Sequence, residues 1–462
     1  MTIWPPRPED LHRPAYKSLA NAIVRATEAG ELNSGDRLPT HRKLASQLGL
    51  SVQTVSRAYD ELIRRGIITG EVGRGTFVRA GRSDTKTPYV PDGHTGDFID
   101  LSILMPVFEP QHMVEMQKAL KRLSADLPAS IMSAFRPSTA LRRYDESAAQ
   151  WLDRCGVDMT DRSLLMTNGN TSAMTVALMT VAGCGDLIVT EDLSHHTLKA
   201  LTRYLGLKVQ GLKTDGEGVM PDAFAAACAR STVKALYVMP SGLNPRAATM
   251  SAKRRTELVN VARKHDVLII ESDAWGPLQP HRPAPIAALA PERTFYFTSL
   301  TKCIMPGLRF GFLAVPNAYQ SAAANRHLVT NWMATPLMAE IASRWIDDGT
   351  AQRLLERQKV ALGRRNRLAA EVLEGLEFHA SENGMHIWMP TPGSWTEEEF
   401  VAHARLNGVA VAPGSAFDTS EGVKDRGVRI CLGGDTPETL KRGLTIISRL
   451  ARSNPEPALL TL

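Results

Sequence analysis

A series of short apolar runs, separated by stretches of helical length, constrains the fold of this chain more than any other feature. The runs consist mainly of β-branched, aromatic and leucine residues. Strands that are apolar on both sides must be covered on both faces, and strands that alternate with helices run mostly parallel. The chain from residue 99 onward is therefore predicted to form an α/β domain with a mostly parallel central sheet. Examples of these runs are residues 187–190, 235–238, 268–271, 294–297 and 310–313.

The N-terminal segment has the pattern of a small helical module. Apolar residues recur at helical spacing between residues 15 and 26, Thr40 is placed to cap a second helix, and Ser51 a third. Two β-forming runs, residues 67–69 and 76–78, flank a glycine-rich turn and predict a two-stranded wing. Three helices followed by a hairpin indicate a winged helix-turn-helix.

The chain of 462 residues is too long for one ordinary compact domain. We expect the winged helix-turn-helix at residues 12–80 and the α/β domain at residues 99–462. Residues 81–98 are rich in Gly, Pro, Ser, Thr and Asp and lack periodicity, so they are predicted to be a linker. Two late β-forming runs, residues 386–389 and 428–430, predict a small α+β subdomain from about residue 347 to residue 462.

The positive charge of the chain is concentrated in its N-terminal module. Residues 11–80 contain 11 Lys and Arg against 6 Asp and Glu, whereas the rest of the chain contains 43 against 42. A basic module on a neutral body indicates a polyanionic partner for that module alone. The alternative is a cationic surface that contacts solvent and has no binding partner.

Cysteine content and hydropathy exclude several classes of protein. The five cysteines are scattered and form no C-x-x-C pair, which argues against a disulfide scaffold and a zinc site and fits a reducing cytoplasm. No metal site is expected. No apolar stretch approaches the roughly 18 residues of a membrane-spanning helix, and residues 1–14 do not have the pattern of a secretory signal.

The second helix of a helix-turn-helix places its first residues in the major groove. Here Gln53 has the amide that pairs with an adenine edge, and Arg57 can reach a base or a phosphate. Cations just before and within the preceding helix would contact phosphates and set the register. Arg74, between two glycines, would let the wing approach the minor groove. The predicted DNA-binding residues are Arg37, Arg42, Lys43, Ser51, Gln53, Thr54, Ser56, Arg57, Arg74 and Gly75.

The order of these residues resembles the GntR family of bacterial regulators. The resemblance rests on GDRLPTHRKLA at residues 35–45, LGLS at residues 48–51 and GRGTFV at residues 73–78. It implies a transcription regulator that binds operator DNA. One position departs from the family, because Val52 stands where the family usually has Arg after the capping Ser, so one base contact and the operator sequence stay undetermined.

The sequence SLTKCIMPGLR, residues 299–309, carries the strongest chemical signal in the chain. Lys302 follows a predicted buried strand, where desolvation disfavours an ammonium charge. A Schiff base with pyridoxal 5'-phosphate would explain a lysine there. Ser299 and Arg309 could then hold the phosphate through a hydroxyl and a guanidinium fork. A surface lysine is the alternative.

Three further segments support a cofactor site. Residues 167–173, TNGNTSA, precede an apolar helix and offer backbone N–H groups as a phosphate cradle. Asn244 follows a predicted strand and offers an amide to the ring hydroxyl. Arg429, on a late strand, can bind a carboxylate with two hydrogen bonds.

Together with VAPGSAF at residues 411–417, these segments resemble the fold-type-I PLP-dependent aminotransferases, and with the N-terminal module the chain resembles the MocR subgroup of GntR regulators. The resemblance implies an aldimine on Lys302 and a carboxylate on Arg429. It also implies a homodimer, since such sites are commonly built across a subunit boundary. The cofactor contacts that it implies come from Asn170, Thr171, Asn244, Ser299 and Arg309.

Two positions depart from that family. Aminotransferases usually carry Asp three residues before Tyr at the ring; in ESDAW, residues 271–275, these places hold Ser272 and Trp275. Asp273 is one residue late and is expected on the other strand face. The aromatic residue that stacks on the ring corresponds to His195. Without a carboxylate at the ring nitrogen the ring is a poorer electron sink, which favours a sensor over a catalyst.

We therefore predict a cytoplasmic transcription regulator that binds operator DNA and senses PLP or an amine or amino acid, with no membrane partner. An active aminotransferase with an accessory DNA-binding domain is one alternative. A winged helix joined to a fold that no longer binds cofactor is another.

Overall fold

The computed structural model describes residues 4–28, 31–32, 36–64, 67–71, 75–78, 98–135, 137–419, 426–434 and 436–455. The chain divides into two compact units, Met1–Pro88 and Tyr89–Leu462, and each is treated by itself. The predicted linker lies outside the described residues except for Phe98.

The first unit contains the three predicted helices: α1 (Ala15–Glu28), α2 (His41–Leu48) and α3 (Val52–Arg64). The Thr40 hydroxyl accepts a hydrogen bond from Lys43 N at 3.4 Å and caps α2. Gly49 ends that helix in the left-handed conformation at φ 63°. The Ser51 hydroxyl accepts from Thr54 N at 3.1 Å and caps α3. Both predicted caps are confirmed.

The wing has one strand more than predicted. Strands β2 (Ile68–Glu71) and β3 (Gly75–Val78) form the expected antiparallel hairpin. β1 (Arg37–Leu38) pairs antiparallel with β3, so the sheet has three strands in the order β1-β3-β2. The predicted hairpin is confirmed, whereas the pairing of β1 was not predicted, because a strand of two residues is too short to show periodicity.

The unit is held together by a single apolar core. Side chains from all three helices are fully buried in it, with Ile68 of the wing. The Tyr59 hydroxyl on α3 donates to Pro39 O at 2.8 Å and joins α3 to the start of α2. Burial of each large aliphatic side chain contributes roughly 1.5–3 kcal/mol to folding. This core fixes the orientation of α3 relative to α2.

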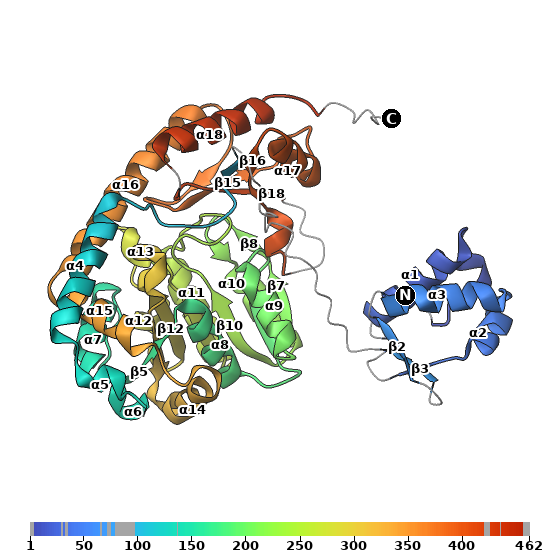
Figure 1. Cartoon of the computed structure of the whole chain (residues 1–462), viewed down its shortest axis with the longest axis horizontal. Coiled ribbons are helices and arrows are strands. Elements are labelled where there is room, and N and C mark those ends of the chain that lie inside the picture. Colours follow the sequence, from blue (N-terminus) through green and yellow to red (C-terminus); the bar gives the residue numbers. More distant parts are fainter. Residues whose placement is uncertain are drawn as a thin grey trace. The chain divides into compact units, whose positions relative to one another are not determined.

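The second unit is built on the predicted, mostly parallel sheet (Figure 1). Its order is β5-β13-β12-β11-β10-β6-β7; β13 is antiparallel to both of its neighbours, and the other neighbouring strands are parallel. All residues of β12 and β13 are buried, as expected for strands covered on both faces. The strands are β5 (Arg162–Thr167), β6 (Leu187–Glu191), β7 (Lys208–Leu212), β10 (Val233–Val238), β11 (Leu268–Ser272), β12 (Thr294–Ser299) and β13 (Gly311–Pro316).

Helices cover both faces of this sheet. Alternate residues of one strand enter different cores: Phe295 and Phe297 pack in the core that contains α8, and Tyr296 packs in the core that contains α7 and α15. The helices are α4 (Pro110–Asp126), α5 (Ala129–Met132), α6 (Pro137–Ala140), α7 (Asp145–Arg154), α8 (Asn170–Val181), α9 (His196–Tyr204), α10 (Pro221–Arg230), α11 (Ala252–Lys264), α12 (Ile286–Leu289), α13 (Leu300–Cys303), α14 (Gln320–Asn331) and α15 (Pro336–Asp347).

The last part of the chain forms a smaller sheet with its own core. Its order is β14-β15-β18-β17, and all of its pairings are antiparallel. The first strand of the unit also joins this region, because β4 (Ile99–Asp100) pairs in parallel with β16 (Val409–Ala410). The elements are β14 (His379–Ala380), β15 (His386–Pro390), β17 (Ala412–Pro413), β18 (Gly427–Cys431), α16 (Thr350–Val372), α17 (Glu397–Leu406) and α18 (Pro437–Ala451).

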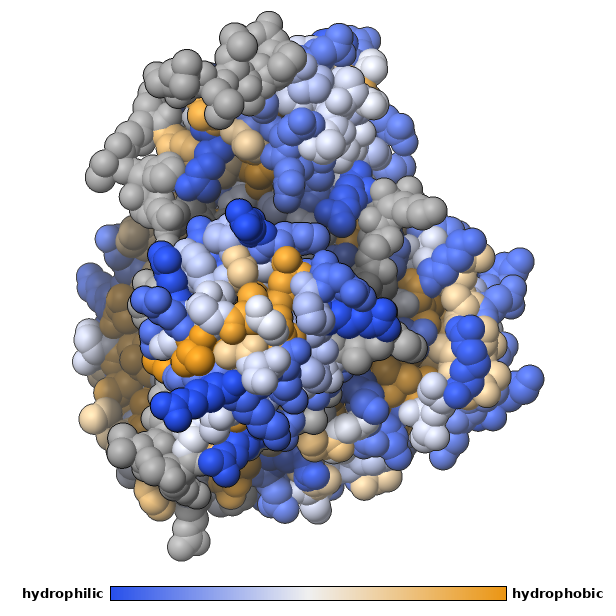
Figure 2. All heavy atoms as spheres, turned by 90° about the vertical axis from the view of Figure 1, so that its right-hand side faces the viewer, coloured by the Kyte–Doolittle hydropathy of each residue, from blue (hydrophilic) through white to orange (hydrophobic). Residues whose placement is uncertain are grey.

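Short elements complete the described structure. β8 (Thr214–Asp215) and β9 (Gly218–Val219) form a small antiparallel hairpin. Within the described ranges, no helix has both the length and the apolar character needed to cross a membrane. The face drawn in Figure 2 is largely hydrophilic, with hydrophobic areas between hydrophilic side chains. The 3-10 helices are η1 (Pro8–Asp10), η2 (Arg142–Tyr144), η3 (Gly276–Leu278), η4 (Pro306–Leu308), η5 (Asn317–Tyr319) and η6 (Gly414–Phe417).

Candidate functional site

Lys302 lies where the central strand β12 ends. It is on α13, the single helical turn that follows β12 directly, and its side chain is largely buried. Its Nζ donates a hydrogen bond to Leu104 O. Burial lowers the pKa of Lys302 to about 8. A primary amine that is partly neutral near neutral pH is a nucleophile.

An anion-binding cradle lies beside it at the N-terminus of α8. The helix begins after Gly169, whose φ is 83°. A Cβ on Gly169 would lie 3.4 Å from Arg309 Nη2 and 3.6 Å from Thr301 Oγ1. A Cβ on Gly311 would lie 3.1 Å from both Gly169 Cα and Ser299 Cβ. A guanidinium, hydroxyl-bearing residues and a positive helix end therefore meet at one point.

The buried polar atoms of this cradle test whether a phosphate fits it. Ser299 is fully buried and Thr301 is 6% exposed. Their hydroxyls have no hydrogen-bond partner among the described residues, nor has Asn170 Oδ1 or Ser172 Oγ. A buried polar group without a partner costs about 1–3 kcal/mol. A phosphate offers the acceptor oxygens that these hydroxyls need, so the residues fit pyridoxal phosphate.

A small cavity next to the cradle has the position of a ring pocket. Five residues predicted from the sequence line it together, although they come from three separate segments. Its lining also includes five apolar or aromatic side chains that the sequence analysis did not predict. The lining residues are Asn170, Thr171, Met174, His195, Tyr237, Met239, Ser272, Ala274, Trp275 and Phe297.

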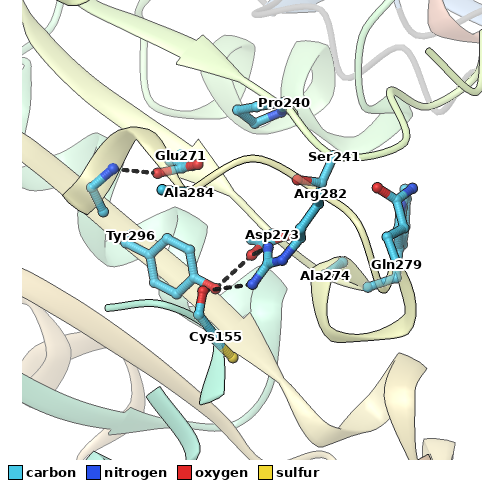
Figure 3. Close-up of polar contacts among 12 residues, drawn as sticks. Cys155, Pro240, Ser241, Glu271, Asp273, Ala274, Gln279, Arg282, Ala284 and Tyr296 are labelled. Carbon is cyan, nitrogen blue, oxygen red and sulfur yellow. Dashed lines mark hydrogen bonds and ion pairs between the residues drawn. The ribbon is translucent and has the colours of Figure 1, made fainter. Parts of the chain in front are cut away.

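Ser272 and its neighbour Asp273 face different surroundings. Ser272 ends β11 and lines the cavity, whereas Asp273 does not. Asp273 is 1% exposed, and its Oδ2 accepts hydrogen bonds from the Tyr296 hydroxyl, at 2.6 Å, and from Arg282 Nη1 (Figure 3). Arg282 also donates to Cys155 O at 2.5 Å. A Cβ on Gly276 would overlap both Asp273 and Arg282, so this ion pair requires glycine there.

Trp275 and His195 also line the cavity, and both have polar partners outside it. The Trp275 indole N–H donates to Gly242 O at 3.1 Å. His195 Nδ1 accepts from Thr197 N at 3.3 Å and caps α9. Its ring stacks on that of His196 with 4.6 Å between centroids. Burial, followed by the positive charges of His196, Arg429 and Lys302, lowers the pKa of His195 well below its ordinary value, so the ring is neutral.

Arg429 and Asn244 form a second polar part of the site, and the charge of Arg429 acts on Lys302. Arg429 is 2% exposed on β18; its Nη1 donates to Asn244 Oδ1 at 2.9 Å, and its Nη2 donates to Ser102 O at 2.6 Å. Its guanidinium lies 4.8 Å from the centre of the Phe417 ring. Arg429 Nε and Asn244 Nδ2 have no partner among the described residues. Both groups are therefore available to an acidic or carbonyl-bearing ligand.

The structure places most predicted DNA-binding residues on the surface of the first unit. Arg42 and Lys43 are exposed at the start of α2, and Gln53 is exposed at the start of α3. Ser51 Oγ and Thr54 Oγ1 form a hydrogen bond of 2.8 Å, which fixes the start of α3. Ser56 is half-buried one turn on.

Arginines on the sides of this surface have other contacts. The Arg57 guanidinium lies 4.2 Å from the centre of the Tyr16 ring on α1. Arg37 is exposed, and a Cβ on Gly75 would lie 2.7 Å from its Nε, which explains a glycine at that point of the wing. Arg74 lies outside the described residues.

Sequence reasoning missed Thr301, Ser172 and the carbonyls of Ser102 and Leu104. Thr301 adjoins Lys302, and Ser172 lies in the cradle sequence, so position alone could have indicated both. Every residue has a backbone carbonyl, so a sequence cannot show which carbonyls contact a site. Those of Ser102 and Leu104 reach the site only through the tertiary fold.

The fold and these residues define a protein of the aminotransferase class with a site for pyridoxal phosphate. The model of the family "Aminotransferase class I and II" matches residues 97–447, and that of "Bacterial regulatory proteins, gntR family" matches residues 15–78. The chain belongs to the class I and II aminotransferase family and carries a GntR-family module at its N-terminal end, the combination found in the MocR subgroup.

Individual known proteins match most of the length of this chain. The chain is 27% identical to the uncharacterized HTH-type transcriptional regulator YdeF of Bacillus subtilis, over 97% of this chain and 96% of the relative. It is 24% identical to the pyridoxine biosynthesis transcriptional regulator PdxR of Corynebacterium glutamicum, over 80% and 81%. The structure of Pyrococcus horikoshii kynurenine aminotransferase superposes with a TM-score of 0.72 at 21% identity, covering 78% of this chain and 91% of that one, and shows the shared fold.

Proposed function

We propose that this chain is a transcription regulator whose first unit binds operator DNA and whose α/β unit holds pyridoxal phosphate to sense an amino compound or the cofactor itself. The observation that carries the proposal is the set of unpartnered, buried hydroxyls around a cationic cradle, next to a largely buried lysine, in a chain with a winged helix. The name of the relative PdxR concerns pyridoxine biosynthesis, which supports vitamin B6 supply as one subject of regulation. Such a regulator acts in the cytoplasm.

Each part of the site has a separate role in this proposal. When bound, pyridoxal phosphate supplies an aldehyde that bonds reversibly to primary amines and a ring that withdraws electrons from them. Lys302 supplies the amine. Asn170, Thr171, Ser299 and Arg309 hold the phosphate, with the hydroxyl of Thr301, because charge-assisted hydrogen bonds to phosphate oxygens are strong.

The other side of the site selects the amino compound. With pyridoxal phosphate bound, Asn244 Nδ2 would donate to the ring oxygen, and Arg429 would bind a carboxylate of the effector. His195, which lines the cavity, would face the ring as a neutral imidazole. An effector that carries both an amine and a carboxylate matches this pair of groups.

The surroundings of Ser272 favour sensing over catalysis. A carboxylate beside the ring nitrogen would keep that nitrogen protonated and strengthen the ring as an electron sink. Ser272 lines the cavity at this strand end, and Asp273 is held by Arg282 and Tyr296. A site without that carboxylate would still allow exchange of amines and would slow proton transfer at the substrate carbon. An active aminotransferase is the second candidate, and the family match supports it.

We further propose that two copies of the chain associate through the hydrophobic surface around α4 and α5. Phe135 is 73% exposed and lies 5.5 Å from Trp332, which is 45% exposed. Large exposed hydrophobic areas mark interaction surfaces. A homodimer would also place two DNA-reading helices on two half-sites. Other exposed hydrophobic residues lie on α4, on α5 or in the chain next to these helices; they are Ile103, Met105, Phe108, Met113, Val114, Leu120, Leu127 and Met132.

Absorption spectroscopy of the purified full chain tests the proposal. A visible band is expected with pyridoxal phosphate in the wild type and none in Lys302→Ala, with Lys199→Ala on the exposed surface of α9 as the matched control. Operator affinity is expected to change when an amino acid is added to the cofactor-bound protein. A colourless wild type would refute cofactor binding, and rapid conversion of the cofactor to its amine form would favour the aminotransferase.

A further inference from the structure

One segment of the second unit connects the cofactor site with the strand that opens the unit. This segment, residues 100–106, is called the strap below. It starts at Asp100, the last residue of β4, and Leu101 anchors it: Leu101 N donates to Ala410 O at 2.9 Å, and Leu101 O accepts from Cys431 N at 2.8 Å. The side chain of Leu101 is 1% exposed in the core of the smaller sheet. The start of the strap is therefore hydrogen-bonded to β16 and to β18, the latter a strand of the smaller sheet.

The two cations of the site hold the middle of the strap. Arg429 Nη2 donates to Ser102 O at 2.6 Å, and Lys302 Nζ donates to Leu104 O. The accepting carbonyls are only two residues apart. Arg429 and Lys302 are the groups that the proposed function assigns to the effector carboxylate and to the cofactor, so the strap occupies donors that a ligand needs.

The rest of the strap is shaped by its ends. Asp100 Oδ1 accepts from Ser102 N at 2.8 Å and from Ser102 Oγ at 2.6 Å, which closes a tight turn. Pro106 O accepts from Gly434 N at 3.3 Å. Between these ends Ile103 and Met105 are 48% and 40% exposed, whereas Leu104 is 8% exposed. The middle of the strap is thus held by hydrogen bonds to its carbonyls and by the buried Leu104 side chain.

We propose that the strap is an autoinhibitory latch, which Lys302 and Arg429 hold in the free protein and which a bound amino compound and cofactor release. The inference rests on the proposed function. When the Lys302 amine condenses with an aldehyde, a C=N bond forms, and both amine hydrogens leave with the aldehyde oxygen as water. The neutral nitrogen that remains has no hydrogen to donate to Leu104 O. A carboxylate at Arg429 competes with Ser102 O in the same way.

Release of the strap changes a segment that is close in sequence to the DNA-binding unit. Carbonyls that lose their donors are costly to keep buried, so the strap shifts to reach other partners. It begins at β4, and the residues before β4 are those that connect the two units along the chain. Ligand binding at the site is therefore transmitted to the start of the second unit, which provides a route to regulation.

Hydrogen exchange of the full-length protein, followed by mass spectrometry, tests the latch. The peptide that contains residues 101–106 is expected to exchange several-fold faster after addition of pyridoxal phosphate. In the absence of cofactor, Lys302→Ala and Arg429→Gln are each expected to accelerate the same peptide. Lys199→Ala and Arg230→Gln, at exposed positions of α9 and α10, are the matched controls and leave it unchanged.

A third variant separates a latch from a static cover. Asp100→Ala removes the turn that shapes the strap and leaves Lys302 and Arg429 in place. A latch that competes with the ligand predicts several-fold tighter binding of pyridoxal phosphate by this variant, measured by absorption titration. A cover that only supports the site predicts weaker binding.

The outcomes distinguish the latch from the function on which it rests. A visible band without any change in strap exchange, or weaker cofactor binding in Asp100→Ala, overturns the latch and leaves cofactor binding standing. If no band forms, the proposed function fails, and the cofactor-free variants still decide whether Lys302 and Arg429 hold the strap. Unchanged exchange in both variants overturns the latch in that case too.

Discussion

The Tyr296 hydroxyl donates a hydrogen bond of 2.6 Å to Asp273 Oδ2 in the interior of the second unit. Tyr296 is fully buried, and burial together with the negative charge of Asp273 raises its pKa well above the ordinary value. Arg282 completes the arrangement (Figure 3). Asp273, the acidic residue that directly follows Ser272, is therefore committed to a structural ion pair.

Placing a carboxylate at the cavity tests this interpretation. Ser272→Asp is expected to accelerate transamination of the bound cofactor by about tenfold or more, because a charge next to the ring nitrogen stabilises the electron-rich state. The rate is measured by following the spectrum of the cofactor in a single turnover with amino acids. Ser272→Asn is the uncharged control. A wild type that already reacts at the rate of Ser272→Asp would contradict the role of Ser272.

Removing the partner of Asp273 tests the structural role of the ion pair. Arg282→Met is expected to lower the free energy of unfolding by about 3–5 kcal/mol, since it leaves a buried carboxylate without its cation. Denaturant titration gives the value. Arg263 pairs with Glu292 on the surface, at 3.1 Å and 46% and 47% exposure, so Arg263→Met should cost less than about 1 kcal/mol. Equal effects of the two substitutions would show that Asp273 does not depend on Arg282.

The pKa of Lys302, lowered by burial to about 8, predicts the pH dependence of cofactor attachment. Only the neutral amine attacks an aldehyde, and a lowered pKa means that the neutral form is already favoured above pH 8. The rate of attachment is expected to rise about tenfold per pH unit below pH 8 and to level off above it. Stopped-flow absorption between pH 6 and 10 measures this. A rate that continues to rise to pH 10 would indicate an ordinary, solvated lysine.

The sequence allowed the general fold and much of the site to be predicted, because both depend on local patterns. Fully apolar runs such as residues 294–297 predict strands buried on both faces, and Lys302 is recognisable where such a strand ends. The cradle is also local, since glycine, hydroxyls and a helix start follow one another at residues 167–173. These features need no knowledge of the tertiary structure.

Other features depend on contacts between residues far apart in the sequence. Strand β1 has two residues and exists because it pairs with β3. The direction in which Asp273 points is determined by Arg282 and Tyr296, and the approach of Leu104 to Lys302 spans 198 residues. No periodicity or motif encodes such pairings, so the strap could not be inferred before the fold was known.

The exposed groups of α2 and α3 predict two kinds of effect on DNA binding. Arg42→Ala and Lys43→Ala should each weaken binding to all sequences and reduce the slope of log affinity against log salt by about one, because a phosphate contact releases counterions. Gln53→Ala should instead reduce the preference for operator over unrelated DNA, since its amide reads a base edge. Arg25, exposed on α1, is the control cation. Fluorescence anisotropy at several salt concentrations separates the two effects, and an unchanged salt slope in both cationic variants would contradict the assignment of α2 to the phosphates.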